Sequence, residues 1–344
     1  MNQNEQQEVH KDLARQGLTV RHFEGEADYP RLADVFTRYM GANGVEASAT
    51  VEDIARQYSS IKGCDPYRDI RLVEAEGQTI AYSRCGWIDE ETDEANEGAL
   101  PTRLYWFRRY LVPEWWDKGI ERALVLLNEK HLAETARSHD FTGPRLFHAY
   151  SYDHHPASGN SLENENYEPV RFEYVMVRPD LENVPDLPLP EGLEVRPVKK
   201  EHWRAIWDAE QEAFRDHWGM AQVDDEDYQR WPNTPEFQPD LWQVAWDGDQ
   251  VAGMIRNFIN QDANERYGRQ RGYTEYISTR RPWRRRGLAR ALLARSLRMH
   301  RDLGMTEAAL SVDTQNPLGA LQLYESMGFR TVGRSVIYRK ALNL

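Results

Sequence analysis

Apolar residues near the end of the chain recur with two different periods. Tyr273 to Thr279 is a short β-prone run, and between Leu288 and Leu303 apolar residues recur at helical spacing. The segment between them reads Arg284-Arg285-Arg286-Gly287. This order predicts a strand that passes through a tight turn into a helix.

The chemistry of this turn favours an anionic ligand. Gly287 lets the backbone approach a ligand closely, and the unpaired N–H groups of the first helical turn point the same way with the positive end of the helix dipole. Neighbouring arginines can add charge-assisted hydrogen bonds to phosphate oxygens. Taken alone, the segment is also compatible with a solvated basic surface or a nucleic-acid patch.

The residues after this helix repeat the same type of organisation. Gly304 ends the helical period, and Ala308 to Val312 predicts a second strand. Asn316-Pro317 then opens a further amphipathic segment, which contains Ala320 to Tyr324 and ends at Gly328-Phe329.

Together the two segments match a known pattern. Arg-x-x-Gly-x-Ala followed by Asn-x-x-x-Ala-x-x-Leu-Tyr-x-x-x-Gly-Phe closely resembles the acetyl-CoA-binding core of the GNAT superfamily of N-acetyltransferases. The resemblance implies that acetyl-CoA is the co-substrate and that the loop and helix start bind its pyrophosphate. It also implies main-chain contacts from the preceding strand to the pantetheine arm and an asparagine near the coenzyme. The residues that correspond are Ile277, Ser278, Thr279, Arg284, Arg285, Arg286, Gly287, Leu288, Ala289, Arg290 and Asn316.

The resemblance also points to catalytic residues. Tyr324 corresponds to the family tyrosine that protonates the departing thiolate, which a phenol can do without ionising beforehand. Glu275 on the preceding strand is a candidate general base, because some relatives place a carboxylate there. Where other relatives carry a glutamate on the next strand this chain has Ser311, and Asp313 is a weaker candidate. No cysteine lies in the motifs, so we expect direct attack in a ternary complex.

An internal repeat accounts for the rest of the chain. Gly17 to Arg21 resembles Gly192 to Arg196, and Arg71 to Ala81 resembles Trp242 to Ala252 as a hairpin signal. We therefore expect an α+β protein of two tandem GNAT-like domains, each with a mixed central sheet flanked by helices. The expected boundaries are a flexible N-terminus over 1–15, a degenerate domain over 16–182, a proline-rich linker over 183–191 and a catalytic domain over 192–344.

The two halves differ at the turn. Trp116, Asp117 and Glu121 occupy the positions that match Arg284, Arg285 and Ala289, and Leu162 lies near the position that matches Tyr324. Two carboxylates would oppose a pyrophosphate, and leucine has no proton to donate. We expect one active site per chain, in the C-terminal half. This arrangement is similar to that of the mycothiol synthase family.

The acceptor pocket is expected along the first helices of the C-terminal half, between Trp203 and Trp231. His217 and Trp218 are the candidate substrate-binding residues, because imidazole can deprotonate an ammonium near neutral pH. Aromatic side chains at helical spacing are more often part of a core or a domain interface. The expected acceptor is the primary amine of a small molecule.

Composition narrows the function classes. A formal charge of −13 argues against general nucleic-acid binding. The two cysteines, Cys64 and Cys85, give no disulfide framework and no zinc spacing, so no metal is expected, and His154-His155 is interpreted as a polar loop. No stretch is long and apolar enough to span a bilayer, and residues 1–17 lack a signal-peptide core. Both observations favour a cytoplasmic protein with no membrane partner. We expect a monomer or a homodimer.

Two other functions stay open at this point. A non-catalytic module that senses acyl-CoA or mediates protein association could use the same fold. Transfer of acetyl to a hydroxyl or to a protein N-terminus would need only a different acceptor pocket.

Overall fold

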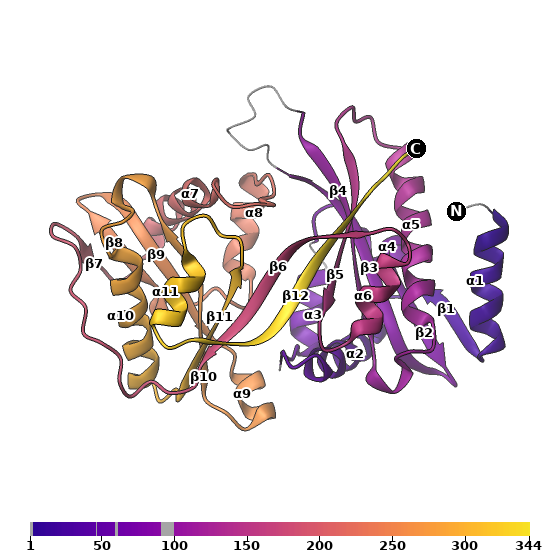
Figure 1. Ribbon diagram of the computed structural model, residues 1–344, viewed down its shortest axis with the longest axis horizontal. Helices are drawn as coiled ribbons and strands as arrows, with labels where there is room; N and C mark the ends of the chain where they lie inside the picture. Colours follow the sequence, from indigo (N-terminus) through magenta and orange to yellow (C-terminus); the bar gives the residue numbers. More distant parts are fainter. Residues whose placement is uncertain (1–2, 46, 59–60, 91–99) are drawn as a thin grey trace. The chain divides into compact units, whose positions relative to one another are not determined.

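The computed structural model describes residues 3–45, 47–58, 61–90 and 100–344, and the chain divides into two compact units. Unit 1 comprises 1–172 and 333–344, and unit 2 comprises 173–332. The division between 172 and 173 lies upstream of the proline-rich segment over 183–191. Each unit is a mixed sheet flanked by helices, as the sequence predicts (Figure 1).

Unit 1 carries a sheet in the order β1-β2-β3-β4-β5-β12, in which the pair β4 and β5 is parallel. The strands are β1 (Leu18–His22), β2 (Ile70–Ala75), β3 (Gln78–Glu90), β4 (Thr102–Leu111), β5 (Arg145–Tyr152) and β12 (Arg330–Ala341). The helices are α1 (Gln3–Arg15), α2 (Tyr29–Ala42), α3 (Val51–Tyr58), α4 (Pro66–Asp69), α5 (Ile120–Arg137) and α6 (Pro156–Glu163).

Unit 2 carries a sheet in the order β6-β11-β10-β9-β8-β7, in which the pair β10 and β11 is parallel. The strands are β6 (Glu168–Arg178), β7 (Glu194–Val195), β8 (Gln243–Asp247), β9 (Gln250–Ile259), β10 (Arg271–Thr279) and β11 (Glu307–Asp313). The helices are α7 (Trp203–Phe214), α8 (Asp225–Arg230), α9 (Gln261–Tyr267), α10 (Leu288–Asp302) and α11 (Ala320–Ser326).

The last strand of each sequence repeat is exchanged between the units. β12 ends the C-terminal repeat, but its residues Ser335 to Ala341 pair with β5 in unit 1. β6 ends the N-terminal repeat, but Glu173 to Arg178 pair with β11 in unit 2. Each sheet is therefore completed by a strand from the other half of the sequence.

Helices α7 and α10 cover opposite faces of the unit 2 sheet (Figure 1). Met254 on β9 belongs to the apolar cluster that includes Ile206 of α7, whereas the next residue, Ile255, belongs to the cluster that includes Leu292 of α10. Successive strand residues point to opposite faces, so this alternation separates two layers of core. Each central strand is consequently buried on both sides.

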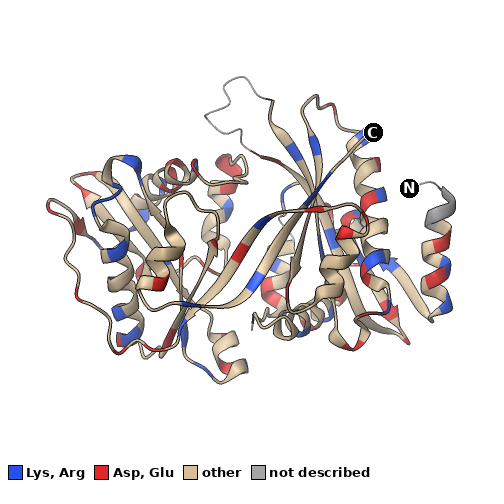
Figure 2. Cartoon of the chain, viewed as in Figure 1, with Lys and Arg blue, Asp and Glu red and all other residues tan. Residues whose placement is uncertain are grey.

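The N-terminus is more ordered than the sequence suggests. Residues 1–2 lie outside the described residues, but Gln3–Arg15 forms α1, with Val9 and Leu13 buried in the core of unit 1. Two apolar residues four positions apart lie on one helical face, which is enough to attach a short amphipathic helix to the core. In Figure 2 acidic and basic residues alternate along the described part of this helix, whereas α10 is mainly basic.

Candidate active site

The strand before the arginine turn contains a β-bulge. Glu275 pairs with Arg256 on β9, but the next pair is Ser278 with Met254, so β10 holds one extra residue. Tyr276 absorbs the distortion with a φ of 52°. Gly253 is required opposite, because a Cβ there would lie 2.8 Å from the Ser278 carbonyl oxygen.

The bulge separates β10 from its parallel neighbour. β10 pairs with β11 only over Arg271 to Tyr273, opposite Glu307 to Ala309. Within the described part of unit 2, the later residues of β10 have no ladder partner on that side. Ile277, Ser278 and Thr279, the expected pantetheine contacts, lie in this diverging part of the strand.

The turn after β10 has the geometry that the sequence predicts for an anion site. Arg285 adopts a φ of 58° and Gly287 a φ of 84°, and α10 begins at Leu288. The first helical hydrogen bond runs from the Ala291 N–H to the Gly287 carbonyl at 3.0 Å. The N–H groups of residues 288–290 therefore have no partner inside the helix and are available to a ligand. Leu288 itself is buried, so its contribution to such a site is limited to the main chain.

The arginines of the turn divide into two kinds. Arg284 is held by protein groups: it donates to the Thr279 carbonyl at 2.9 Å and to the Ala213 carbonyl at 3.2 Å, and it forms an ion pair with Asp216. The same ion pair and Arg281 lower the pKa of the Asp216 carboxyl to about 2. Arg284 thus fastens the end of α7 to the turn.

Arg285 and Arg290 are exposed and make no hydrogen bond or ion pair with any residue that the structure describes. Arg286, also exposed, donates to the Glu191 carbonyl at 3.2 Å. Arg285 and Arg290 therefore retain their full donor capacity for a phosphate, whereas Arg284 does not.

Two residues that the sequence assigned to different ligands lie together. The Asn316 side-chain amide lies 3.3 Å from His217 Nε2, and its carbonyl accepts from the Leu318 N–H at 2.8 Å. His217 follows Asp216, so the segment 213–217 contacts both the arginine turn and the loop after β11. This position places His217 beside the expected coenzyme residue. Trp218, next in sequence, is half-buried.

Glu275 has an unusual environment for a carboxylate. Burial raises the pKa of its carboxyl, and the charge of Glu173 adds to the rise. Hydrogen bonds from the main chain and side chain of Ser311 and the charge of Arg256 oppose it, and the resulting pKa is about 8. Glu173 reaches this place because β6 pairs with β11, where Asp313 is its partner. No pattern in the sequence pointed to Glu173, because β6 belongs to the other repeat.

Tyr324 lies on α11 and is 6% exposed. Burial raises the pKa of its phenol well above the ordinary range, and the charge of Glu275 raises it further. Asp313, the reserve candidate for the base, accepts from the Gln315 N–H at 2.9 Å and so stabilises a turn.

An aromatic and charged cluster beside Glu275 was also missed. Arg256, directly opposite Glu275, forms a buried ion pair with Glu210 of α7 at 3.0 Å. Its guanidinium lies 3.6 Å from the centre of the Tyr276 ring, close to Trp231 and Trp242. Burial raises the pKa of the Glu210 carboxyl to about 7. The only sequence signal was the density of tryptophans, which is also typical of a core.

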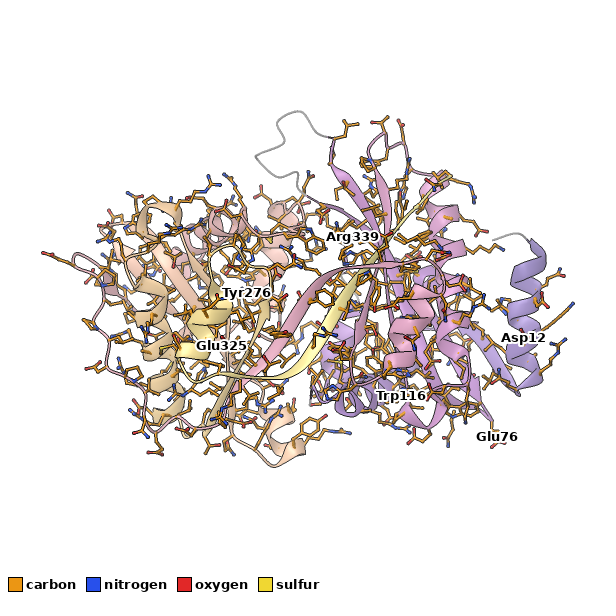
Figure 3. All side chains as sticks on the ribbon, in the orientation of Figure 1. Asp12, Glu76, Trp116, Tyr276, Glu325 and Arg339 are labelled. Atoms are coloured by element: carbon orange, nitrogen blue, oxygen red, sulfur yellow. The ribbon has the colours of Figure 1, made fainter. Side chains whose placement is uncertain are left out.

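The corresponding turn of unit 1 has the same backbone conformation as the turn of unit 2 but different side chains. Asp117 and Gly119 have φ angles of 62° and 80°, close to those of Arg285 and Gly287. Trp116 (labelled in Figure 3) stacks on His155 with ring centres 3.9 Å apart, and His155 lies 2.9 Å from the buried Glu121 carboxylate. His155 is 2% exposed, so the interpretation of His154-His155 as a polar loop is wrong for His155. The Trp116–His155 pair and the Glu121 carboxylate therefore lie at the start of α5, where the arginines lie in unit 2.

Comparisons with known proteins agree with this architecture. Residues 203–329 match the acetyltransferase (GNAT) family model. A mycothiol acetyltransferase of Geodermatophilus obscurus is 26% identical over 305 residues, 87% of this chain and 90% of that protein. One from Salinispora arenicola is 26% identical over 323 residues, 91% of this chain and 94% of that protein.

Solved structures show the same fold over nearly the whole length. A GCN5-related N-acetyltransferase from Sphaerobacter thermophilus has a TM-score of 0.70 at 24% identity and covers 95% of this chain and 96% of its own. A tandem GNAT protein from the clavulanic acid biosynthesis pathway has a TM-score of 0.65 at 14% identity, covering 95% and 99%. With the bulged strand, the arginine turn and the repeated unit, these matches support an acyltransferase that has a tandem GNAT fold and a match to the GNAT family model over residues 203–329.

Proposed function

We propose that the chain transfers acetyl from acetyl-CoA to the primary amine of a small molecule, and that unit 2 alone carries the active site. GNAT acetyltransferases use acetyl-CoA as co-substrate. The residues present suit its pyrophosphate, because three helix N–H groups and the unpaired Arg285 and Arg290 meet at one turn. Bound acetyl-CoA supplies a thioester at the opening between β10 and β11.

Glu275 is the proposed base. Its raised pKa lets it accept a proton from an incoming ammonium near neutral pH, directly or through water, which leaves a neutral amine to attack the thioester carbonyl. As the C–N bond forms and the C–S bond breaks, main-chain N–H groups of the diverging part of β10 stabilise the oxyanion. Tyr324 then donates its proton to the sulfur, which leaves as a neutral thiol, and the second proton lost by the attacking nitrogen returns to the Tyr324 phenolate through solvent.

The observation that carries the proposal is the position of Glu275 and Tyr324. The charge of Glu275 raises the pKa of the Tyr324 phenol. Glu275 itself lies on the bulged strand immediately before the arginine turn. A carboxylic acid with a pKa near 8 and a buried phenol form a matched pair for taking one proton and giving another. A sensor would need neither group.

The relatives bear on the acceptor. Two that cover most of the chain are named mycothiol acetyltransferase, which favours an acceptor chemically related to the precursor of mycothiol. The charge of Glu173 close to Glu275 suits a cationic amine.

The test is acetyl-CoA-dependent release of free thiol over a panel of amines, alcohols and peptides. We expect release that depends on a primary amine and a stable amide product by mass spectrometry. Tight acetyl-CoA binding without acceptor-dependent release would instead support a sensor, and an ester product would support transfer to a hydroxyl.

A further inference from the structure

Unit 1 contains a cavity of about 150 Å³ between α1, β1, β2 and α5. This is roughly the volume that five water molecules occupy in the liquid. Its lining includes one carboxylate, that of Glu134, and two apolar residues. The remaining lining residues are cationic or imidazole side chains: His10, Arg21, His22, Arg71, Lys130 and His131.

Arg71 is the residue that makes this cavity unusual. It lies on β2, directly opposite His22 of β1. Its Nη1 atom is buried and has no hydrogen-bond partner among the described residues. A buried donor without a partner is unfavourable, and a guanidinium cannot lose its charge to avoid that cost.

The other cations at the cavity are compensated by carboxylates. Arg21 lies 2.6 Å from Asp28 and 2.9 Å from Glu74. Lys130 lies 3.6 Å from Glu134. The charge without a carboxylate partner is therefore that of Arg71.

Two of the histidines at the cavity, His131 and His22, differ in their charged neighbours. His131 Nε2 lies 2.5 Å from Asp69 Oδ1, so this imidazole also has a carboxylate partner. Burial lowers the pKa of His22, the charges of Arg71 and His131 lower it further, and the charge of Asp69 opposes them. An anion would be attracted to the positive charge of Arg71.

We propose that this cavity binds an oxyanion, such as the phosphate group of a small molecule, with Arg71 as its principal ligand and Lys130 as a second cation. Arg71 lines the cavity and has no carboxylate partner among the described residues, and its planar guanidinium can bind two phosphate oxygens at once. The binding function would belong to unit 1 and is independent of the acetyl-transfer site.

A cation is the competing occupant. Side-chain atoms of Asp69, Cys85 and His131 lie within 4.8 Å of one another, a combination that could hold a metal. However, the 2.5 Å between Asp69 and His131 is shorter than the roughly 3.3 Å between two ligands of one tetrahedral zinc. Burial also raises the pKa of the Cys85 thiol, and Arg71 lies beside it. This cluster is held by hydrogen bonds, and the neighbouring guanidinium repels a cation.

The test uses the imidazole NMR signals of the full chain, which contains 10 histidines. The signals of His22 and His131 are assigned with the variants His22→Gln and His131→Gln. Inorganic phosphate is then titrated at constant ionic strength into the wild type, Arg71→Gln and the control Arg56→Gln, an exposed arginine on α3 in the same unit. Lys130→Gln serves if Arg71→Gln does not fold.

We expect phosphate to shift the His22 and His131 signals saturably in the wild type and in Arg56→Gln. In Arg71→Gln or Lys130→Gln the affinity should fall at least about tenfold. An absence of shifts, or equal shifts in Arg71→Gln, would overturn the proposal. Shifts caused by Zn²⁺ but not by phosphate would overturn it in favour of a cation site.

Discussion

Ser311 on the neighbouring strand is in contact with Glu275 and lowers the pKa of its carboxyl through both its main chain and its hydroxyl. β10 and β11 have already diverged at this level, because their ladder ends at Tyr273 and Ala309. The contact therefore holds the proposed base at the opening where a thioester would lie. Ser311 stands where some relatives carry a glutamate, and here it positions the carboxylate of the adjacent strand.

Replacing Tyr324 with Phe should lower kcat about 100-fold while the Kd for acetyl-CoA stays nearly constant, because the phenol acts as an acid only when charge develops on sulfur. Steady-state kinetics and calorimetry measure the two effects. Tyr273→Phe is the control, since Tyr273 lies on the paired part of β10. An unchanged kcat would remove Tyr324 from the mechanism.

The pH profile of kcat/KM should rise with a pKa near 8, because the base acts only when Glu275 is deprotonated. Arg256→Met removes a positive charge opposite Glu275 and should move this pKa upward. Glu210→Gln removes the ion-pair partner of Arg256. The positive charge of Arg256 then acts more strongly on Glu275, so the pKa of Glu275 should move downward. Shifts of the same sign in both variants would contradict this arrangement, and circular dichroism checks that each variant is folded.

The two kinds of arginine should respond differently to substitution. Arg285→Gln and Arg290→Gln should each weaken acetyl-CoA binding about 10-fold or more with little change in Tm, because a hydrogen bond to a charged group contributes about 1.5–3 kcal/mol. Arg301→Gln, at the opposite end of α10, is the matched control. Equal binding by all three variants would exclude this turn as the pyrophosphate site.

Arg284→Gln should instead lower stability, by about 1–3 kcal/mol, because it removes contacts to Asp216, Thr279 and Ala213. Urea unfolding measures this difference against the wild type. A variant as stable as the wild type that had lost coenzyme affinity would show that Arg284 acts as a ligand rather than as a fastener.

Much of unit 2 could be predicted from local sequence. The strand, turn and helix around Gly287 follow from periodicity and from one glycine with a positive φ, and the repeat located the same backbone at Gly119. What could not be predicted depends on pairing between distant segments. The exchange of β6 and β12 leaves no trace in local periodicity, and so Glu173 could not be placed near Glu275.

Side-chain partners were also beyond the sequence. The arginines of the turn look equivalent in the sequence. In the structure, however, Arg284 forms an ion pair with Asp216, whereas Arg285 is exposed. Trp116 was correctly singled out as different from Arg284, but its stacking on His155 needed the fold to be seen.

We propose one coenzyme site per chain, in unit 2, although the chain contains the turn twice. Calorimetric titration of acetyl-CoA into the wild type, Arg285→Gln and Trp116→Leu measures the number of sites and locates them. We expect one molecule bound per chain, a loss of affinity in Arg285→Gln and an unchanged stoichiometry and affinity in Trp116→Leu. Two molecules per chain, or binding lost in Trp116→Leu and retained in Arg285→Gln, would contradict it.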